Sequence, residues 1–424
     1  MKTKAVRLYG KEDLRLEEFE LPPIREDEIL ARVVSDSICM SSYKAAKQGT
    51  AHKRVPDNAA ENPPIIGHEF AGELIEVGSR WQHKFKPGQK YSIQPAIYYE
   101  EGPVGILSAP GYSYPYIGGD ATYVIIPKDV LEQDCLLPYT GPGYYPASLA
   151  EPLSCVIGAM HASYHTTPGS YVHQMEIRDG GKMAILAGVG PMGLAAINFV
   201  INRADRKPSL LVVTDILQER LDRAATIFPP RMAEDNGIKL VYMNTGKLND
   251  PVASLKALTD SAGYDDVFVF APVADVIEEG DAILAANGCL NFFAGPSNPQ
   301  FSAKMNFYNV HYASTHIVGT SGGNNEDMVE ALDCLSKGLD PAGLITHIGG
   351  LNTVIDTTLN LPDIPGGKKL IYTHIDLPLT AINDLDRLGK DNPLFFELAK
   401  RVARTRGLWN VEAENYLLAN ADRI

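Results

Sequence analysis

Three residues that lie far apart in the chain, Cys39, His68 and Glu151, could supply a thiolate, an imidazole and a carboxylate to one metal ion. A catalytic zinc ion takes three such protein ligands and leaves a fourth position for water or substrate. Taken singly, a cysteine is more often a small buried hydrophobic residue, and a histidine at the entrance to a strand is more often structural. Glu69, next to His68, is an alternative or transient ligand, or a side chain that orients the ligands. The combination predicts a Lewis-acid site.

A second candidate site is the glycine turn Gly188-Val189-Gly190-Pro191-Met192-Gly193. Its glycines permit a tight turn, let the backbone approach a pyrophosphate and allow a helix to pack closely on a sheet, and the helix N-terminus faces the phosphates. The pattern alone is weak, because an ordinary strand-to-helix turn can contain the same glycines. Here it follows an expected strand, Lys182–Ala187, and precedes an expected helix, Met192–Ile201. This context predicts a dinucleotide-binding site.

Asp215 ends the next expected strand, 22 residues after Gly193. An acidic residue at this place binds the two hydroxyls of the adenosine ribose and repels a 2′-phosphate, which favours NAD(H) over NADP(H). Arg220 is a nearby cation that could accommodate a 2′-phosphate, so NADP(H) stays open as the alternative. A Lewis-acid metal together with a nicotinamide predicts hydride exchange with a carbinol carbon.

The secondary structure that must position these residues changes along the chain. Up to about residue 150, short alternating or β-branched runs bounded by proline and glycine predict strands. Residues 182–293 alternate strand and helix, which predicts a parallel sheet with helices on both faces. Helices are expected at Leu153–His165, with Ser148 as N-cap, and at Glu326–Lys337. The expected fold class is α/β.

Size and charge restrict the partners of this chain. It has 424 residues, 45% of them hydrophobic and 21% charged, enough for two or three domains. The net charge of −14 and the isoelectric point near 5.2 argue against binding to nucleic acid or to an anionic membrane surface, both of which need a basic face. The longest apolar stretches are too short to span a bilayer. Neither a nucleic-acid nor a membrane partner is therefore expected.

The N-terminus and the cysteines indicate the compartment. Residues Met1–Leu8 carry charges without the apolar run of a signal peptide. The 5 cysteines are scattered and contain no CxxC pair, so a disulfide framework is not expected. These features favour a reducing cytoplasm.

Several stretches of the sequence match one family of enzymes: Ile38–Ser42, Gly67–Gly72, Lys86–Gly88, Gly118–Val124, Glu151–Cys155, the glycine turn and Gly319–Gly323. Through them the sequence resembles the medium-chain, zinc-dependent alcohol and polyol dehydrogenases along essentially its whole length. Within that family it is most similar to the bacterial L-sorbose-1-phosphate reductases. That narrower resemblance rests on the tyrosine- and proline-rich residues 94–117 and on the ending, especially Gly349–Asp356.

The resemblance implies a fold with two parts. A GroES-like, β-rich catalytic domain would comprise residues 1–160 and 319–424. A Rossmann domain with a doubly wound parallel sheet, residues 161–318, would be inserted into it. The cleft between the two domains would hold the metal and the nicotinamide.

The resemblance also implies roles for particular residues. Cys39, His68 and Glu151 fall on the positions of the zinc ligands. Ser41 falls on the hydroxyl that hydrogen-bonds the alcohol oxygen and begins its deprotonation. The loops that border the nicotinamide would be Ala294-Gly295-Pro296 and Gly319-Thr320-Ser321.

Two departures from the family pattern affect these expectations. Many relatives hold a structural zinc ion with four closely spaced cysteines near residues 95–115. This chain has tyrosines there but no cysteine, so we expect one catalytic zinc ion, no structural one, and aromatic packing in its place. Lys44 stands where many relatives have a relay histidine. A lysine could pass a proton only with a lowered pKa, so water or the ribose hydroxyls of the cofactor are the alternative relay, and Lys44 is equally well explained as a solvated charge.

The resemblance implies a ketose phosphate or polyol phosphate as substrate, of the type of L-sorbose 1-phosphate and sorbitol 6-phosphate. A phosphate needs cationic or N–H donors, and the candidates are Lys44, Lys47, His52-Lys53-Arg54, Lys304 and, more weakly, Lys368-Lys369. The alternatives are an unphosphorylated polyol or a threonine-like alcohol, a zinc-free reductase of the same fold, and an inactive cofactor-binding protein. A homodimer or homotetramer is expected only because members of the family commonly form such oligomers.

Overall fold

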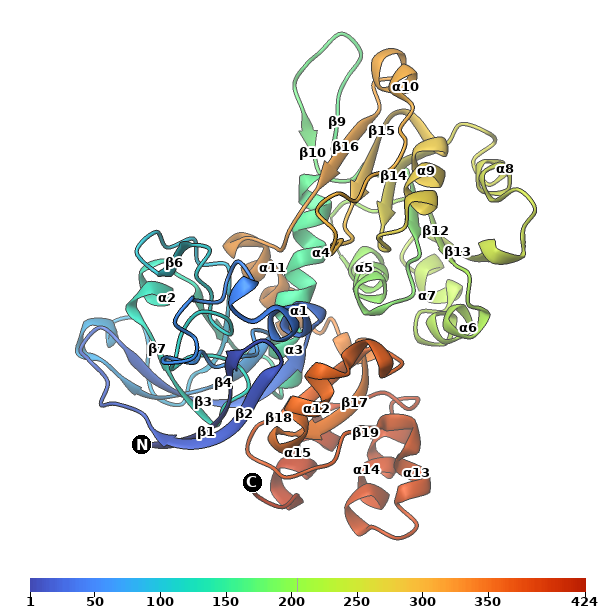
Figure 1. The fold of residues 1–424 in the computed structure, drawn as a ribbon. Coiled ribbons are helices and arrows are strands. Elements are labelled where there is room, and N and C mark those ends of the chain that lie inside the picture. The colour runs from blue at the N-terminus through green and yellow to red at the C-terminus, as the bar shows by residue number, and fades with distance from the viewer. Residues whose placement is uncertain (204) are drawn as a thin grey trace. The chain divides into compact units, whose positions relative to one another are not determined.

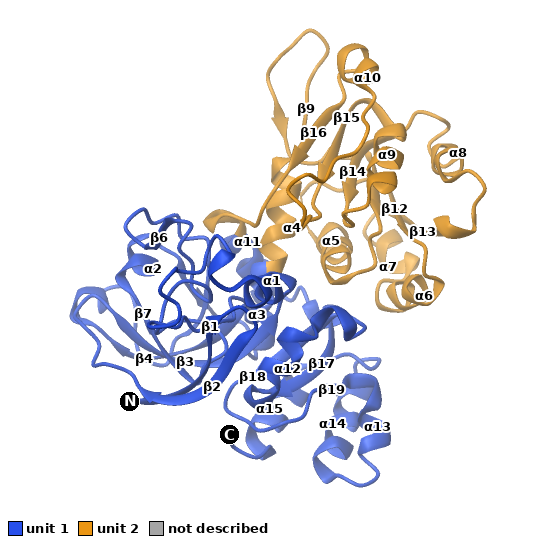
Figure 2. Ribbon diagram, viewed as in Figure 1, with its two compact units in different colours: residues 1–151, 328–424 blue, residues 152–327 orange. Residues whose placement is uncertain are grey.

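The structure is a computed structural model that describes residues 1–203 and 205–424, and it contains two compact units. Unit 1 consists of Met1–Glu151 and Met328–Ile424, and unit 2 consists of Pro152–Asp327 (Figure 2). The chain therefore leaves unit 1 to form unit 2 and then returns, in the order expected for an inserted domain.

The limits of the units differ from the expected domain limits at residues 160 and 318. Unit 2 begins inside helix α4 (Ala150–Ala162) and ends inside helix α11 (Asn325–Ser336). Each of these helices thus has its first residues in one unit and its remaining residues in the other.

Unit 1 is built mainly from antiparallel strands (Figure 1). Within the described residues its largest sheet has eight strands in the order β19-β17-β18-β3-β4-β5-β8, with β7 also paired to β3. A separate hairpin joins β1 to β2. The strands are β1 (Lys2–Gly10), β2 (Asp13–Glu20), β3 (Ile29–Ile38), β4 (Phe70–Val77), β5 (Lys90–Ile93), β6 (Pro103–Ile106), β7 (Tyr123–Ile126), β8 (Leu136–Tyr139), β17 (Ile345–Gly350), β18 (Lys368–Tyr372) and β19 (Thr380–Ala381).

Buried apolar side chains hold unit 1 together in several clusters, and two of these contain the most buried residues. One lies among the N-terminal strands and includes Ile29, Phe70 and Tyr91. The other surrounds the fully buried Trp409 in the C-terminal segment. The helices of unit 1 are α1 (Met40–Gln48), α2 (Lys128–Glu132), α3 (Tyr145–Ser148), α12 (Val354–Leu359), α13 (Leu385–Leu388), α14 (Pro393–Ala403) and α15 (Val411–Asn420).

Unit 2 contains the expected parallel sheet. Its six strands lie in the order β13-β12-β11-β14-β15-β16, and every neighbouring pair is parallel. The chain winds outward from β11 in one direction and then from β14 in the other, so right-handed crossovers put the connecting helices on opposite faces. The strands are β11 (Lys182–Leu186), β12 (Leu210–Asp215), β13 (Lys239–Asn244), β14 (Tyr264–Val269), β15 (Leu284–Phe292) and β16 (His316–Gly319).

Strands β11, β12 and β14 of this sheet are almost continuously buried and rich in valine, isoleucine and leucine, as expected where helices cover both faces. A short hairpin of β9 and β10 precedes the sheet. The remaining elements of unit 2 are β9 (Tyr164–His165), β10 (Gln174–Met175), α5 (Pro191–Asn202), α6 (Gln218–Ile227), α7 (Pro230–Glu234), α8 (Pro251–Ala257), α9 (Ala274–Ala282) and α10 (Phe307–Tyr312).

The helix expected at Leu153–His165 was predicted too far along the chain. Helix α4 begins at Ala150 and ends at Ala162, and Tyr164 and His165 pair with Met175 and Gln174 in the β9–β10 hairpin. Ser148 is not its N-cap, because it belongs to α3. No helix of the described chain combines the length and the apolarity that crossing a bilayer requires.

Candidate metal and dinucleotide sites

The sheet of unit 1 brings its metal-binding candidates together from distant parts of the sequence. Strand β3 ends at Ile38, so Cys39 lies at the turn into α1. Strand β4 is antiparallel to β3, with Asp36 opposite Phe70, and this pairing places His68 and Glu69 beside Cys39. The metal-binding candidates therefore meet at one end of a pair of hydrogen-bonded strands.

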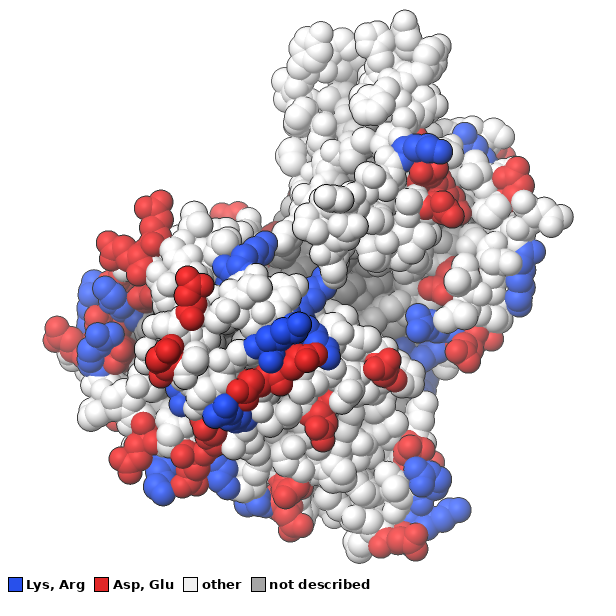
Figure 3. Space-filling view, in the orientation of Figure 1, with Lys and Arg blue, Asp and Glu red and all other residues white. Residues whose placement is uncertain are grey.

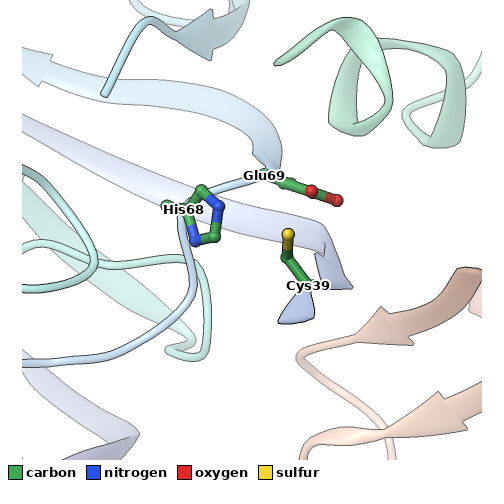
Figure 4. A group of neighbouring side chains, drawn as sticks. All are labelled: Cys39, His68 and Glu69. Carbon is green, nitrogen blue, oxygen red and sulfur yellow. The ribbon is translucent and has the colours of Figure 1, made fainter. Parts of the chain in front are cut away.

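One ligand atom from each of Cys39, His68 and Glu69 lies within 4.8 Å of the others. Figure 4 shows the three side chains gathered in one small region, with the cysteine just before α1 and the other two just before β4. Sulfur, imidazole nitrogen and carboxylate oxygen are donors that zinc accepts, and a set of three leaves one position open. The donor set thus fits a catalytic zinc ion.

Hydroxyl groups surround the imidazole of His68. Ser42 Oγ lies 3.2 Å from its Nδ1, while Ser41 Oγ lies 3.2 Å from its Nε2. When the ring carries its proton on Nδ1, it donates to Ser42 and leaves the lone pair of Nε2 for a metal, the usual arrangement of a ligating histidine. Ser41 also donates to Cys39 Sγ at 3.1 Å. Ser41 thus lies among the ligand atoms, as its expected role requires.

Tyr112 is a further hydroxyl at this site. Its Oη lies 3.3 Å from His68 Nε2, and the centres of the two rings are 4.9 Å apart. The preceding residue, Gly111, has a positive φ of 81°, and a Cβ there would lie 2.1 Å from the carbonyl oxygen of Gly67. Only glycine allows this loop to approach the segment of His68 so closely. Glycine at 111 therefore places the tyrosine against the histidine.

Burial sets the protonation of both ligands when no metal is bound. It raises the pKa of the Cys39 thiol to about 12, and the negative charges of Glu69 and Glu151 act in the same direction. It lowers the pKa of His68 to about 4. At neutral pH the thiol is protonated and the imidazole is neutral, so binding of a divalent cation displaces a proton from sulfur.

Glu69 is engaged in a buried ion pair. Lys368 Nζ lies 2.5 Å from one carboxylate oxygen of Glu69 and 2.6 Å from the other, and both side chains are buried. Burial on its own would lower the pKa of Lys368, but the charge and hydrogen bond of Glu69, together with the charges of Cys39 and Glu151, outweigh it, so the pKa is raised and the lysine stays charged. Strand β18, which begins at Lys368, pairs with β3 next to Cys39. The ion pair therefore borders the metal ligands.

Glu151 is the second residue of α4 and is half buried. It is not a member of the group of ligand atoms within 4.8 Å, whose carboxylate is that of Glu69. The charge of Glu151 nevertheless acts on Cys39, Tyr112 and Lys368, raising the pKa of each. The negative charges of two carboxylates therefore raise the pKa of the same thiol, that of Cys39. One is Glu69, which is paired with Lys368, and the other is Glu151 on α4.

A buried pair of aspartates supports the segment of His68 from behind. Asp36 Oδ1 accepts a hydrogen bond from the backbone N–H of Glu69 at 3.1 Å. Burial, and then the charge of Asp120, raise the pKa of Asp36 well above its usual range. The pKa of Asp120 is raised to about 7 by the same burial. The strand end that carries two metal-binding candidates is therefore fixed by a side-chain bond as well as by the sheet.

The glycine turn of unit 2 has the geometry of a dinucleotide site. It connects β11 to α5, with Gly190 as N-cap and Pro191 in the first turn of the helix. A Cβ on Gly193 would lie 2.1 Å from the carbonyl oxygen of Gly188, whereas a Cβ on Gly190 would meet no protein atom within 4 Å. Gly193 is thus required for packing, and Gly190 leaves open space for a close-approaching ligand. Met192 follows within the first turn of α5, which presents free N–H groups.

Asp215 is the last residue of β12 and is mostly buried. Its Oδ1 accepts a hydrogen bond from the backbone N–H of Leu217 at 3.0 Å, which orients the carboxylate at the carboxyl end of the strand. Arg220 lies on α6 and is exposed. Ligands of open α/β sheets bind outside the carboxyl ends of the strands. Asp215 lies at such an end, which is the position expected for a residue that binds the adenosine ribose.

The expected nicotinamide loops follow the last two strands of the sheet. Ala294 lies two residues after the end of β15 and is mostly buried, and its N–H donates to Val269 O at 3.1 Å. Gly295 is exposed. Thr320 and Ser321 follow β16, half buried and exposed respectively. Both loops therefore begin at carboxyl ends of strands in the same sheet as the glycine turn.

The expected cationic residues differ in their surroundings. Lys44 lies on α1 and is half buried, and Lys304 is exposed. Lys47 forms an ion pair with Glu12 at 2.5 Å. Lys368 and Lys369 are not surface residues of a loop, as the sequence suggested, because β18 buries both. Lys369 donates to three backbone carbonyl groups, those of Ile364, Pro365 and Gly367.

The tyrosines of residues 94–117 form a packed cluster only in part. Tyr112 and Tyr114 are buried, and Tyr114 donates to Asp129 Oδ2 at 2.7 Å. Tyr98 and Tyr116 are exposed. Aromatic packing therefore holds for the second half of this stretch, where the chain turns back toward His68.

Three residues near the metal-binding candidates were not identified from the sequence. They are Ser42, Tyr112 and Lys368, the last of which is the partner of Glu69. Ser42 had a usable signal, because it lies three residues after Cys39 on the helix that the cysteine precedes. Tyr112 and Lys368 had none, since each reaches the site through long-range pairing of loops and strands.

Comparison with known proteins agrees with this architecture. Residues 25–135 match the family model described as "Alcohol dehydrogenase GroES-like domain". Residues 210–337 match the model described as "Zinc-binding dehydrogenase". The first match contains Cys39, His68 and Tyr112, and the second contains Asp215 and the loops after β15 and β16.

Two curated relatives match nearly the whole chain. It is 52% identical over 417 residues to a mannitol-1-phosphate 5-dehydrogenase of Aliivibrio fischeri, covering 98% of this chain and 97% of that protein. It is 50% identical over 423 residues to an L-sorbose 1-phosphate reductase of Klebsiella pneumoniae, covering 100% and 98%.

A solved structure has the same fold at low identity. A protein of Sinorhizobium meliloti 1021, described as a zinc-binding dehydrogenase bound to NADP, aligns with a TM-score of 0.68 and 19% identity, covering 88% of this chain and 99% of that one. Since half of its residues are shared with full-length relatives and both family models match, this chain belongs to the zinc-binding medium-chain dehydrogenase family.

Proposed function

We propose that this enzyme transfers hydride between a nicotinamide cofactor and a polyol phosphate or its ketose phosphate. The observation that carries the proposal is the convergence of Cys39, His68 and a carboxylate in unit 1, in a chain whose unit 2 has an open glycine turn. Relatives that share half of its residues over their full lengths are named for mannitol 1-phosphate and L-sorbose 1-phosphate.

The proposed metal ligands are Cys39, His68 and Glu151, holding one catalytic zinc ion. Glu69 is the alternative carboxylate, and both of its oxygens already bond to Lys368. If Glu69 keeps Lys368 as its partner, Glu151 is the third metal ligand. If Lys368 is released, Glu69 can take the place of Glu151 as the ligand. When bound, zinc supplies Lewis acidity that polarises the substrate oxygen.

The side chains around the metal site perform the proton chemistry in this proposal. Ser41 Oγ, which lies 3.1 Å from Cys39 Sγ and 3.2 Å from His68 Nε2, accepts the hydroxyl proton of the substrate during oxidation. Ser42 holds the imidazole in the tautomer that leaves Nε2 free. Tyr112 excludes water from one side of the imidazole and offers a hydrogen bond to the substrate. Lys44, or water and the ribose hydroxyls, would pass the proton onward.

For the cofactor we propose NAD(H) rather than NADP(H). Asp215 supports this choice, because its oriented carboxylate would repel a 2′-phosphate and accept hydrogen bonds from two ribose hydroxyls. Arg220, exposed on α6, is the cation through which NADP(H) could bind instead. Gly188, Gly190 and Gly193 would receive the pyrophosphate, and the loops at 294–295 and 320–321 would border the nicotinamide.

We also propose that the enzyme is a cytoplasmic homodimer or homotetramer. At the end of unit 2 that carries β9, β10 and α10, the visible face has no charged side chain (Figure 3). Exposed aromatic residues gather there, among them Tyr171, Phe307, Tyr308 and Tyr312, and exposed apolar patches mark interaction surfaces. No disulfide joins the cysteines in the described part of the chain, which suits a reducing compartment.

The direct test measures zinc content and turnover together. Purified protein is assayed with NADH and L-sorbose 1-phosphate, L-sorbose and 2-amino-3-oxobutyrate, and its metal is determined by elemental analysis. We expect one zinc ion per chain and fastest turnover of the phosphorylated ketose. Metal-free protein with full activity, or protein without any turnover when loaded with zinc, would refute the proposal.

A pair of variants distinguishes the two carboxylates. Glu151→Gln should reduce zinc retention at least tenfold in a chelator competition if Glu151 is the third ligand. Glu69→Gln is the matched change, and it should leave zinc bound more tightly than Glu151→Gln does. The reverse order of zinc affinities would make Glu69 the ligand.

A further inference from the structure

A cationic group lies across Tyr112 from the metal ligands. His52 stacks on the ring of Tyr112, with ring centres 5.8 Å apart and planes inclined by 11°. The guanidinium carbon of Arg54 lies 5.9 Å from the centre of the same ring. The hydroxyl end of this ring faces His68 at 3.3 Å. One tyrosine thus contacts the metal site with its hydroxyl and a pair of cationic or N–H donors with its face.

The segment that carries these donors is fixed to the protein. Arg54 Nη1 donates to Leu107 O at 3.0 Å, and Ser113 Oγ donates to Arg54 O at 2.7 Å. The adjacent Val55 is buried. The long connection between Cys39 and His68 therefore does not simply extend into solvent, and its cations are held next to the loop of Tyr112.

The group carries unbalanced positive charge. No carboxylate of residues 1–203 or 205–424 forms an ion pair with Arg54, and His52 and Arg54 are both half buried. Burial, and then the positive charges of Arg54, Lys53 and Lys44, lower the pKa of His52 to about 4. Lys44 on α1 thus acts on the same ring as the two residues of the 52–54 segment.

The hydrogen bonds of His52 define what it can donate. Its Nδ1 accepts the backbone N–H of Arg54 at 3.3 Å, so the neutral ring carries its proton on Nε2. The donors of the group are then one imidazole N–H and a guanidinium fork. This combination suits a dianion with several acceptor oxygens, such as a phosphate monoester. A neutral polyol would not balance the charge.

We propose that His52 and Arg54 form a phosphate subsite, which holds the phosphoryl group of the substrate while the reacting carbon lies at the metal site beside Tyr112. This inference rests on the proposed function, and it names the feature that would select a phosphorylated over an unphosphorylated substrate. Lys53, which is exposed, would add long-range attraction rather than a fixed contact.

The test compares kcat/KM for L-sorbose 1-phosphate with kcat/KM for L-sorbose in the zinc-loaded enzyme with NADH. In Arg54→Met the ratio of the two should fall on the order of 100-fold, because truncating one partner of a charge pair in a binding site costs that much or more. Most of the change should appear in KM for the phosphorylated substrate.

Two control variants separate the subsite from general effects. Arg80→Met removes an exposed arginine of unit 1 that pairs with Glu132 at 3.2 Å, and it should leave the ratio unchanged. Tyr112→Phe keeps the ring under His52 and Arg54 but removes the hydroxyl that faces His68. It should therefore keep the ratio while lowering turnover of both substrates.

The outcomes distinguish this inference from the proposed function. A wild-type enzyme that turns over both compounds with a ratio near one would overturn the subsite and leave the dehydrogenase intact, as would an Arg54→Met enzyme that keeps the wild-type ratio. An enzyme inactive on both compounds would refute the proposed function. In that case calorimetric titration with inorganic phosphate decides, because the subsite requires binding that Arg54→Met weakens at least tenfold, and equal or absent binding in both proteins would overturn it.

Discussion

The candidate metal site of unit 1 and the candidate dinucleotide site of unit 2 are built in different ways. The glycine turn is a local structure in which one strand, six residues and one helix supply the binding groups from the backbone. The metal site is made of side chains whose positions depend on the pairing of β18, β3 and β4 and on the loop of Tyr112. A local backbone site tolerates change elsewhere in the chain, whereas a site of distant side chains depends on the whole unit.

The largest expected effect of a single change is at the centre of the metal site. Cys39→Ser replaces a thiolate by a poor zinc ligand, so we expect loss of bound zinc and a fall in turnover of at least about 1000-fold. Binding of NADH, measured by fluorescence titration, should stay within twofold of the wild type, because the glycine turn belongs to the other unit. Equal activity in the variant would refute the metal assignment, and joint loss of zinc and NADH binding would break the contrast between the sites.

The Lys368–Glu69 pair tests how strongly the metal site depends on distant residues. Lys368→Met leaves a buried carboxylate without its partner, which should cost roughly 3–5 kcal/mol of unfolding free energy. Denaturant titration followed by tryptophan fluorescence reports on unit 1 alone, because both tryptophans, Trp81 and Trp409, lie there.

The double variant Glu69→Gln and Lys368→Met is the control for this pair. It removes the buried charge as well as its partner, so it should recover most of the lost stability. A Lys368→Met protein as stable as the wild type would mean that Glu69 is protonated or solvated, and the ion pair would then have no structural role.

In unit 2, Gly190→Ala separates ligand binding from folding. A methyl group at this position meets no protein atom within 4 Å, so the melting temperature should not change. The same methyl group would project toward the pyrophosphate, and we expect KM for NADH to rise about 10- to 100-fold. Gly193→Ala is the matched change, in which the methyl group would clash with the carbonyl of Gly188 and lower stability too. Unaltered cofactor binding in Gly190→Ala would argue against the pyrophosphate position.

The smallest expected effect concerns cofactor choice. Asp215→Ala removes a carboxylate that is oriented by the N–H of Leu217 and should reduce the preference for NAD over NADP by about tenfold, measured as the ratio of kcat/KM values. Zinc content serves as the control, because it should not change. An unchanged cofactor ratio would exclude Asp215 from ribose recognition.

The same contrast explains how much could be predicted from the sequence. The parallel sheet, the glycine turn and the position of Asp215 at the end of a strand could all be predicted. Alternating strands and helices and the spacing of glycines are local signals in the sequence. The end of α4 was misjudged, since no proline or glycine follows Ala162 before Pro168, although Tyr164 and His165 pair with β10. Tertiary pairing overrode the local preference there.

The metal site could be predicted only in its donor residues. Cys39 and His68 are indicated by residue type together with the family resemblance, and they meet as expected. The burial of Lys368 against Glu69 could not be foreseen, because its neighbours Pro365, Gly366 and Gly367 look like a surface loop. The position of Tyr112 depends on the close approach that Gly111 permits, which no local pattern indicates.

X-ray absorption at the zinc edge of the purified enzyme tests the central claim most directly. The account predicts one zinc ion per chain whose shell contains one sulfur, from Cys39, and otherwise nitrogen and oxygen, with the sulfur signal lost together with the metal in Cys39→Ser. A shell without sulfur, a shell of four sulfurs, or a protein that binds no zinc would contradict it.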